Sequence, residues 1–172
     1  MRTHVVSLAG AALVVTAVGF VAASARSAER STPGRQRSAA PASQKPAAPS
    51  MVVYKSPTCG CCSAWIEHLR ARGFQVEANN VSDSQLGVIA IQSGVPGDLT
   101  SCHTAKVGGY IVEGHVPAED IHRMLKEKPA IAGIAVGGMP IGSPGMEQGS
   151  SKQPFTTMAF TKDGKRTVFA KH

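Results

Sequence analysis

Three of the four cysteines in this chain occupy four consecutive positions, in the order Cys59-Gly60-Cys61-Cys62. The cluster follows the short apolar run of residues 51–54 and precedes a helix-like segment. A thiol placed where a strand turns into a helix gains acidity from the helix N-terminus, and several neighbouring soft sulfurs can share a soft metal ion. The cluster therefore predicts a strand-to-helix turn and indicates either redox chemistry or copper chemistry.

Strand and helix patterns alternate after residue 50. The apolar, β-branched residues 51–55 predict a strand, and the apolar spacing over 60–72 predicts a helix that ends at Gly73. The remaining predicted elements are a strand over 74–78, a helix over 82–93, a strand that has Cys102 and His103 at or just before its start and runs through Val112, a helix over 117–126, and a hairpin formed by 155–160 and 166–169. Asp163-Gly164 is a strong hairpin-turn signal between the last two strands.

This order predicts an α/β domain of the thioredoxin-like class, with a mixed sheet flanked by helices and an added C-terminal loop or helical element. In that fold the first strand-to-helix turn holds a reactive Cys-x-x-Cys pair, and a cis-proline before the terminal hairpin faces it. Cys59 and Cys62 have that spacing. Pro140 has that place in the order, so we predict a cis peptide bond between Met139 and Pro140.

The first 50 residues differ in composition from the rest. Residues 5–25 are almost wholly apolar, follow Arg2, and end in a small-x-small pattern that signal peptidase accepts. We therefore predict an export signal over 1–25, with an uncleaved membrane anchor as the alternative. Residues 26–50 are rich in Ser, Ala, Pro and Gln and predict a disordered linker, which leaves 51–172 as the folded domain.

The chain has 18 Lys and Arg against 11 Asp and Glu. Five of the basic residues and only one acidic residue lie in the predicted linker. The predicted domain has no basic stripe, and this argues against nucleic acid as a partner.

The cysteine spacing separates several kinds of thiol chemistry. Cys59 and Cys62 can act as attacking and resolving thiols, whereas a plain disulfide oxidoreductase has no use for the third thiol of Cys61. For Cu(I) the third thiolate is an asset, because bridging sulfurs can hold several ions. Purely structural disulfides are disfavoured, since Cys61 and Cys62 are neighbours and a bridge from Cys59 to Cys62 closes a very small loop. Zinc is a poorer match, because structural zinc usually takes two separated ligand pairs.

Other soft or imidazole ligands stand elsewhere in the chain. Cys102 is favoured as a fourth sulfur ligand over a small buried hydrophobe, and the neighbouring His103 is either a ligand or a surface residue. Met139 and Met146 flank a glycine-rich loop, and thioethers suit Cu(I), although methionine also fills gaps in cores. His115 is interpreted as the end of a strand.

Four short motifs follow one another in the chain: residues 58–62, 101–104, 114–117 and 139–147. In this order they resemble the CopG-like copper-resistance proteins of Gram-negative bacteria, over about residues 51–170. The resemblance implies a periplasmic thioredoxin-like domain whose C-terminal extension helps to bind metal. It also implies copper ions bridged by the sulfurs of Cys59, Cys61, Cys62 and Cys102, and interconversion of Cu(I) and Cu(II) in support of detoxification and efflux.

The sequence therefore favours a periplasmic copper-binding protein for copper resistance, and leaves open whether it is an enzyme. One alternative is a thiol-disulfide oxidoreductase with Cys59 as nucleophile and Cys62 as resolver. A second is a passive carrier that hands copper to an efflux partner. The expected partners are copper ions and an efflux or electron-transfer protein, with membrane contact only if the N-terminal segment remains uncleaved.

Overall fold

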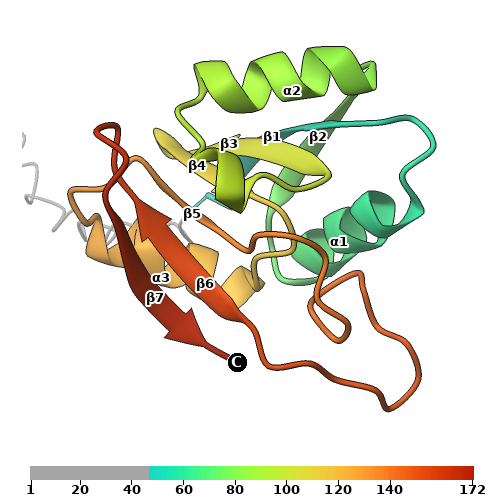
Figure 1. Ribbon diagram of the computed structural model, residues 1–172. Coiled ribbons are helices and arrows are strands. Elements are labelled where there is room, and N and C mark those ends of the chain that lie inside the picture. Colours follow the sequence, from blue (N-terminus) through green and yellow to red (C-terminus); the bar gives the residue numbers. More distant parts are fainter. Residues whose placement is uncertain (1–46) are drawn as a thin grey trace, which may run out of the picture. The chain divides into compact units, whose positions relative to one another are not determined.

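A computed structural model describes residues 47–172 (Figure 1). The predicted export signal and most of the predicted linker lie outside the described residues. Seven strands form one mixed sheet in the order β2-β1-β3-β4-β5-β6-β7. Within residues 47–172, no helix has the length and apolar character needed to cross a bilayer.

The first three elements are β1 (Ser50–Lys55), α1 (Gly60–Ala71) and β2 (Gln75–Asn80). Helix α1 connects the two strands, which are parallel neighbours in the sheet. Helix α1 begins where the Sγ atom of Cys59 accepts a hydrogen bond from the backbone N–H of Cys62 at 3.3 Å. The helix then buries one apolar stripe against the sheet, as its spacing predicted. The cysteine cluster thus lies at a strand-to-helix turn.

The segment after Cys102 folds differently from the prediction. A single strand through Val112 was wrong: the chain forms β3 (His103–Val107) and β4 (Tyr110–Glu113), an antiparallel hairpin. Gly108 and Gly109 between them have φ values of 55° and 86°, a left-handed backbone that glycine adopts without steric cost. The fold-back sets β3 against β1 and places His103 opposite Lys55.

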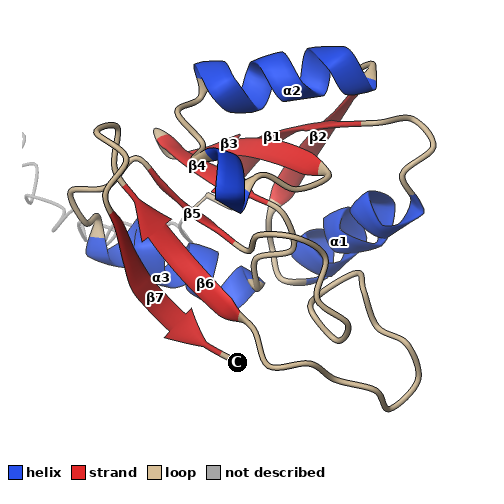
Figure 2. Cartoon of the chain, viewed as in Figure 1, coloured by secondary structure: helices blue, strands red, loops and turns tan. Residues whose placement is uncertain are grey.

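Helices cover both faces of the sheet (Figure 2). Helix α2 (Asp83–Gln92) lies on one face, beside the short 3₁₀ helix η1 (Gly97–Leu99), while α1 and α3 (Ala118–Glu127) lie on the other. Reciprocal hydrogen bonds between Ser82 and Gln85 cap the start of α2, where the sequence predicted the start of a helix. The main core lies between the sheet and the pair α1 and α3.

Beyond α3 the sheet continues through β5 (Gly133–Ala135), β6 (Thr156–Phe160) and β7 (Arg166–Lys171). The predicted hairpin around Asp163-Gly164 is confirmed as β6 and β7. The predicted cis bond before Pro140 is wrong, because no peptide bond in residues 47–172 is cis. The predicted hairpin, β6–β7, does not face the cysteine turn. The β3–β4 hairpin faces it, and Cys102 directly precedes that hairpin. Pro140 lies in the loop of residues 136–155 after β5.

Candidate metal centre

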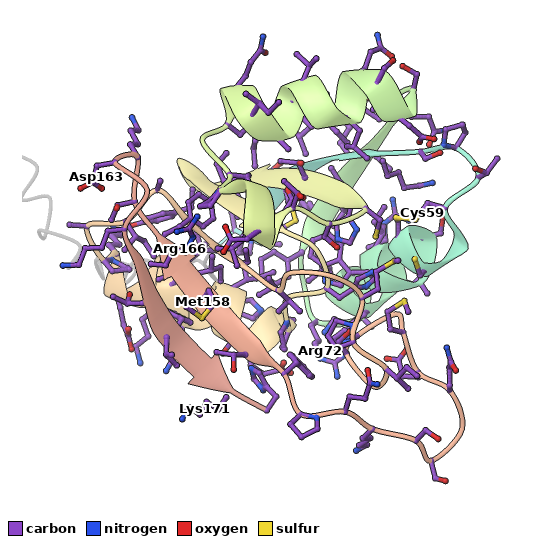
Figure 3. The ribbon with its side chains drawn as sticks, viewed as in Figure 1. Cys59, Arg72, Met158, Asp163, Arg166 and Lys171 are labelled. Atoms are coloured by element: carbon purple, nitrogen blue, oxygen red, sulfur yellow. A yellow bond between two sulfur atoms is a disulfide. The ribbon has the colours of Figure 1, made fainter. Side chains whose placement is uncertain are left out.

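The four cysteines meet at one end of the sheet. Cys59 caps α1, Cys61 and Cys62 lie in its first turn, and Cys102 directly precedes β3; Figure 3 labels Cys59 where the chain enters α1. Their Sγ atoms all lie within 4.8 Å of one another. The structure therefore brings together the four sulfurs that the sequence singled out as metal ligands.

The four sulfurs are not in equivalent states. Cys59 and Cys62 are joined by a disulfide bond, and Cys61 and Cys102 are free. The Cys61 Sγ atom lies 3.5 Å from Cys59 Sγ and 4.0 Å from Cys102 Sγ. Cys62 is fully buried, whereas the other three cysteines are partly exposed. A free thiol thus stands between the disulfide and the fourth sulfur.

Burial raises the pKa of the Cys102 thiol to about 12, and the nearby Cys61 adds to the increase. The Ser101 hydroxyl, 3.9 Å from Cys102 Sγ, lowers this pKa but has a weaker effect than burial. Cys102 is therefore a neutral thiol at neutral pH. A metal ion that takes Cys102 as a thiolate must displace its proton.

Two buried histidines face Cys102. His103 Nδ1 lies 3.4 Å from the Cys102 Sγ atom, and the His103 ring packs against Trp65 with centroids 4.3 Å apart. Its Nε2 has no hydrogen-bond partner among the described residues. Burial lowers the pKa of His103 to about 3, with a further contribution from His115, so the ring is neutral. His103 was predicted as either a ligand or a surface residue, and the structure rules out the surface alternative.

His115 is the site residue that the sequence reasoning missed. Its Nε2 lies 3.2 Å from Cys102 Sγ, and its Nδ1 lies 2.8 Å from the carbonyl oxygen of Pro144. Because a carbonyl only accepts, Nδ1 holds the proton and Nε2 presents its lone pair towards Cys102. Burial lowers the pKa of His115, which favours this neutral form. The available signal was its place in the third of the four motifs, residues 114–117.

The loop of residues 136–155, which contains Met139 and Met146, contacts the site through its backbone. Pro144 accepts the hydrogen bond of His115, and the Gly138 carbonyl accepts one from the Ser101 hydroxyl at 2.7 Å. The Met139 side chain is 53% exposed, and Met146 is partly buried. The loop is thus hydrogen-bonded to Ser101, which precedes Cys102, and to His115, which faces it. Copper binding by the two thioethers remains a prediction.

A buried carboxyl group supports the start of β3. Glu113 accepts hydrogen bonds from the backbone N–H of Ser101 and from the Thr104 hydroxyl, each at 2.7 Å. Its side chain is almost wholly inaccessible, and burial raises its pKa to about 7 despite these two donors. Glu113 therefore holds the segment on both sides of Cys102 and His103, through the backbone of Ser101 and the side chain of Thr104.

Comparison with known proteins identifies the family. Residues 99–146 match the family described as "Protein of unknown function, DUF411". Two solved structures of a copper resistance protein copG, Form 1 and Form 2, are 39% identical to this chain with a TM-score of 0.68. Each comparison covers 73% of this chain and 98% of the solved one. The chain belongs to the CopG family of copper resistance proteins. No curated protein sequence matches it.

The family and the thioredoxin-like α/β fold predicted from the sequence are thereby confirmed. In this CopG-family protein a second group of Cys102, His103 and His115 shares Cys102 with the four-sulfur group. Thiolates and imidazoles together suit a soft metal ion such as copper. The disulfide between Cys59 and Cys62 must open before those two sulfurs can act as thiolate ligands.

Proposed function

We propose that this protein is a periplasmic copper-binding protein of copper resistance, which holds Cu(I) through the thiolates of Cys59, Cys61, Cys62 and Cys102. The observation that supports it most is the convergence of four Sγ atoms within 4.8 Å. Four soft sulfurs in one place can bridge several Cu(I) ions while neutralising their charge. The two related solved structures are those of a copper resistance protein.

The imidazoles and thioethers around the sulfurs complete the proposed ligand set. His115 Nε2 is a nitrogen ligand that needs no proton loss, because its proton is on Nδ1. His103 Nδ1 lies 3.4 Å from the same Cys102 Sγ atom and is the second nitrogen ligand. Met139 and Met146 are additional Cu(I) ligands contributed by the C-terminal loop.

The proposal extends to a change in the oxidation state of copper. When Cys59 and Cys62 are both thiolates, each can give one electron to a Cu(II) ion. The two Cu(II) ions become two Cu(I) ions, one S–S bond forms, and no proton is exchanged. The reverse reaction oxidises two Cu(I) ions and opens the disulfide. The disulfide 3.5 Å from the free thiol of Cys61 supports this coupling of copper to a thiol pair.

The same disulfide favours a second candidate, a thiol-disulfide oxidoreductase with Cys59 as nucleophile and Cys62 as resolver. The variant Cys61→Ser distinguishes the two candidates. Under the copper proposal the copper stoichiometry falls, while exchange by Cys59 and Cys62 continues. A variant that binds as much copper as the natural protein would overturn the four-sulfur site.

Metal analysis and copper spectroscopy on protein from a copper-supplemented periplasm test the proposal directly. We expect bound copper, and more of it after the disulfide is reduced. Turnover of Cu(II) to Cu(I) with a defined dithiol donor would establish an enzyme, and binding without turnover would establish a carrier. Cell fractionation tests the export signal of residues 1–25, since retention in the cytoplasm would contradict the proposed periplasmic location.

A further inference from the structure

A cavity of about 510 Å³ opens beside the disulfide. It lies between α2, η1 and the turn that leads from β1 into α1. Both Cys59 and Cys102 line it, and Leu86, Ala90 and Ile91 of α2 form an apolar wall. Apart from Cys59, Ser101 and Cys102, the residues that line the cavity take part in no contact described above, so the cavity is open to a molecule outside the folded chain.

The proposed copper site requires a reductant at this position. A disulfide is opened by a thiolate that attacks one of its two sulfur atoms. Cys62 is fully buried, whereas Cys59 is partly exposed and lines the cavity. A reductant that occupies the cavity therefore reaches Cys59 and leaves Cys62 as the departing sulfur.

The lining restricts the chemistry of the reductant. Ile91 is 74% exposed, and the cavity wall on α2 is apolar apart from Asp83. No Lys, Arg or His of the described chain lines the cavity. A small anionic thiol finds no cationic partner there, whereas an apolar segment that is neutral or basic is complementary to the wall and to Asp83.

Gly87 is a second observation that points to an occupant. It lies in the middle of α2 and lines the cavity. A Cβ atom added there would meet nothing within 4 Å among the described residues, so no packing contact of the chain requires glycine. Glycine inside a helix costs about 1 kcal/mol relative to alanine. Glycine at this position leaves the cavity free of a side chain from residue 87, at the cost of helix stability.

From these observations we infer that the cavity is the docking site for a reductant protein, which inserts an apolar, neutral or basic segment that bears a pair of cysteines. One partner thiolate attacks Cys59 Sγ, a mixed disulfide forms, and Cys62 leaves as a thiolate. The second partner thiolate then attacks the mixed disulfide and releases Cys59. The partner is oxidised to a disulfide, its two thiol protons go to solvent, and the copper site gains two thiolates.

This inference rests on the redox part of the proposed function, and disulfide-opening kinetics on the oxidised full-length protein test it. One probe is a capped, uncharged peptide with two cysteines among leucines, and the other is glutathione, an anionic thiol, at equal thiolate concentration. Alkylation and mass spectrometry follow the opening of the disulfide. We expect the peptide to react at least about tenfold faster than glutathione.

Variants of α2 provide matched controls. Gly87→Leu fills the cavity without a backbone clash and should remove the advantage of the peptide, while its melting temperature stays at or above that of the natural protein. Ile91→Lys should also slow the peptide several-fold. Val88→Lys should not, because Val88 is 50% exposed on α2 but does not line this cavity.

Equal rates for the peptide and glutathione would overturn the inference. So would a Gly87→Leu variant that reacts as fast as the natural protein, or equal slowing by Ile91→Lys and Val88→Lys. Cu(I) titration of the chemically reduced natural protein and of Gly87→Leu separates this failure from that of the proposed function. If neither binds Cu(I), the copper proposal fails, and the peptide kinetics still decide the role of the cavity.

Discussion

The position of one proton determines what His115 can do. The carbonyl of Pro144, 2.8 Å away, keeps that proton on Nδ1, and burial keeps the ring neutral. The Nε2 lone pair is consequently aimed at Cys102 without any change of protonation. The backbone carbonyl of Pro144 thus orients the nitrogen that we propose as a copper ligand, an arrangement that is common around metal-binding histidines.

Replacing His115 should weaken copper binding more than it disturbs the fold. We expect His115→Gln to lower the Cu(I) affinity of the reduced protein by at least about tenfold, because a ligand nitrogen is lost. Competition with a Cu(I) chelator measures this change. His122→Gln is the control, since His122 is exposed and bonds only to the Arg72 carbonyl among its described hydrogen-bond partners. Equal affinities in both variants would contradict a ligand role for His115.

Glu113 should make stability depend on pH. Burial raises its pKa from the usual 4.5 to about 7, so the folded protein keeps a proton that the unfolded chain loses. The stability that Glu113 contributes is therefore complete below pH 4.5, declines as the pH rises, and is lost above pH 7. Glu113→Gln retains a neutral group that can bond to Ser101 and Thr104, and it does not titrate.

We accordingly expect the melting temperature of the natural protein, relative to that of Glu113→Gln, to fall between pH 4.5 and pH 8. Thermal unfolding of both proteins across that range measures the difference. Titration of the histidines affects both proteins alike and cancels in the comparison. Parallel melting curves over the whole range would show that Glu113 has an ordinary pKa.

The loop of residues 136–155 is held against α1 by a close backbone approach at Gly145. A Cβ atom there would lie 2.6 Å from the Cys61 carbonyl oxygen and 2.7 Å from the Trp65 backbone nitrogen, and the φ of Gly145 is +82°. Pro144 directly precedes Gly145, and its carbonyl oxygen orients His115. The contact between this loop and α1 therefore sets the geometry of the His115 ring.

Gly145→Ala should both destabilise the fold and weaken the site. We expect a loss of about 1–3 kcal/mol in the free energy of unfolding, because the new methyl group cannot fit and the backbone is strained. Cu(I) affinity should fall as Pro144 moves away from His115. Gly149→Ala separates the two causes, since Gly149 also has a positive φ but open space around it. If the two variants bind Cu(I) equally well, the loop does not hold His115 in place.

Local signals allowed the elements of the fold to be predicted, and contacts between distant residues limited the prediction. The starts of the two helices near Cys59 and Ser82 and the Asp163-Gly164 turn each depend on a few neighbouring residues, and all three are present. Gly108-Gly109 was missed as a turn because apolar residues continue on both sides of it. The role of His115 depends on Pro144, 29 residues away, and no local pattern reports that contact.

The site is assembled from pieces that only the complete fold brings together. Three sulfurs come from the β1–α1 turn, Cys102 directly precedes β3, and His115 follows β4. The turn supplies its three cysteines within four residues, so even an unfolded chain offers them to Cu(I) together. Cys102 and His115 join them only in the folded protein. Copper should therefore distinguish the folded from the unfolded chain mainly through these two residues.

Thermal unfolding of the reduced full-length protein with and without Cu(I) tests this coupling of copper to the fold. A ligand present at 100 times its dissociation constant stabilises the folded state by about 2.7 kcal/mol when the unfolded chain does not bind it, which corresponds to about 10 °C for a domain of this size. We expect an increase below that limit in the natural protein, because the turn cysteines also bind Cu(I) in the unfolded chain. Cys102→Ser should keep Cu(I) bound at the turn but lose most of the increase, because the turn binds Cu(I) in the unfolded chain as well. The same increase in both proteins would mean that Cys102 does not link copper to the fold.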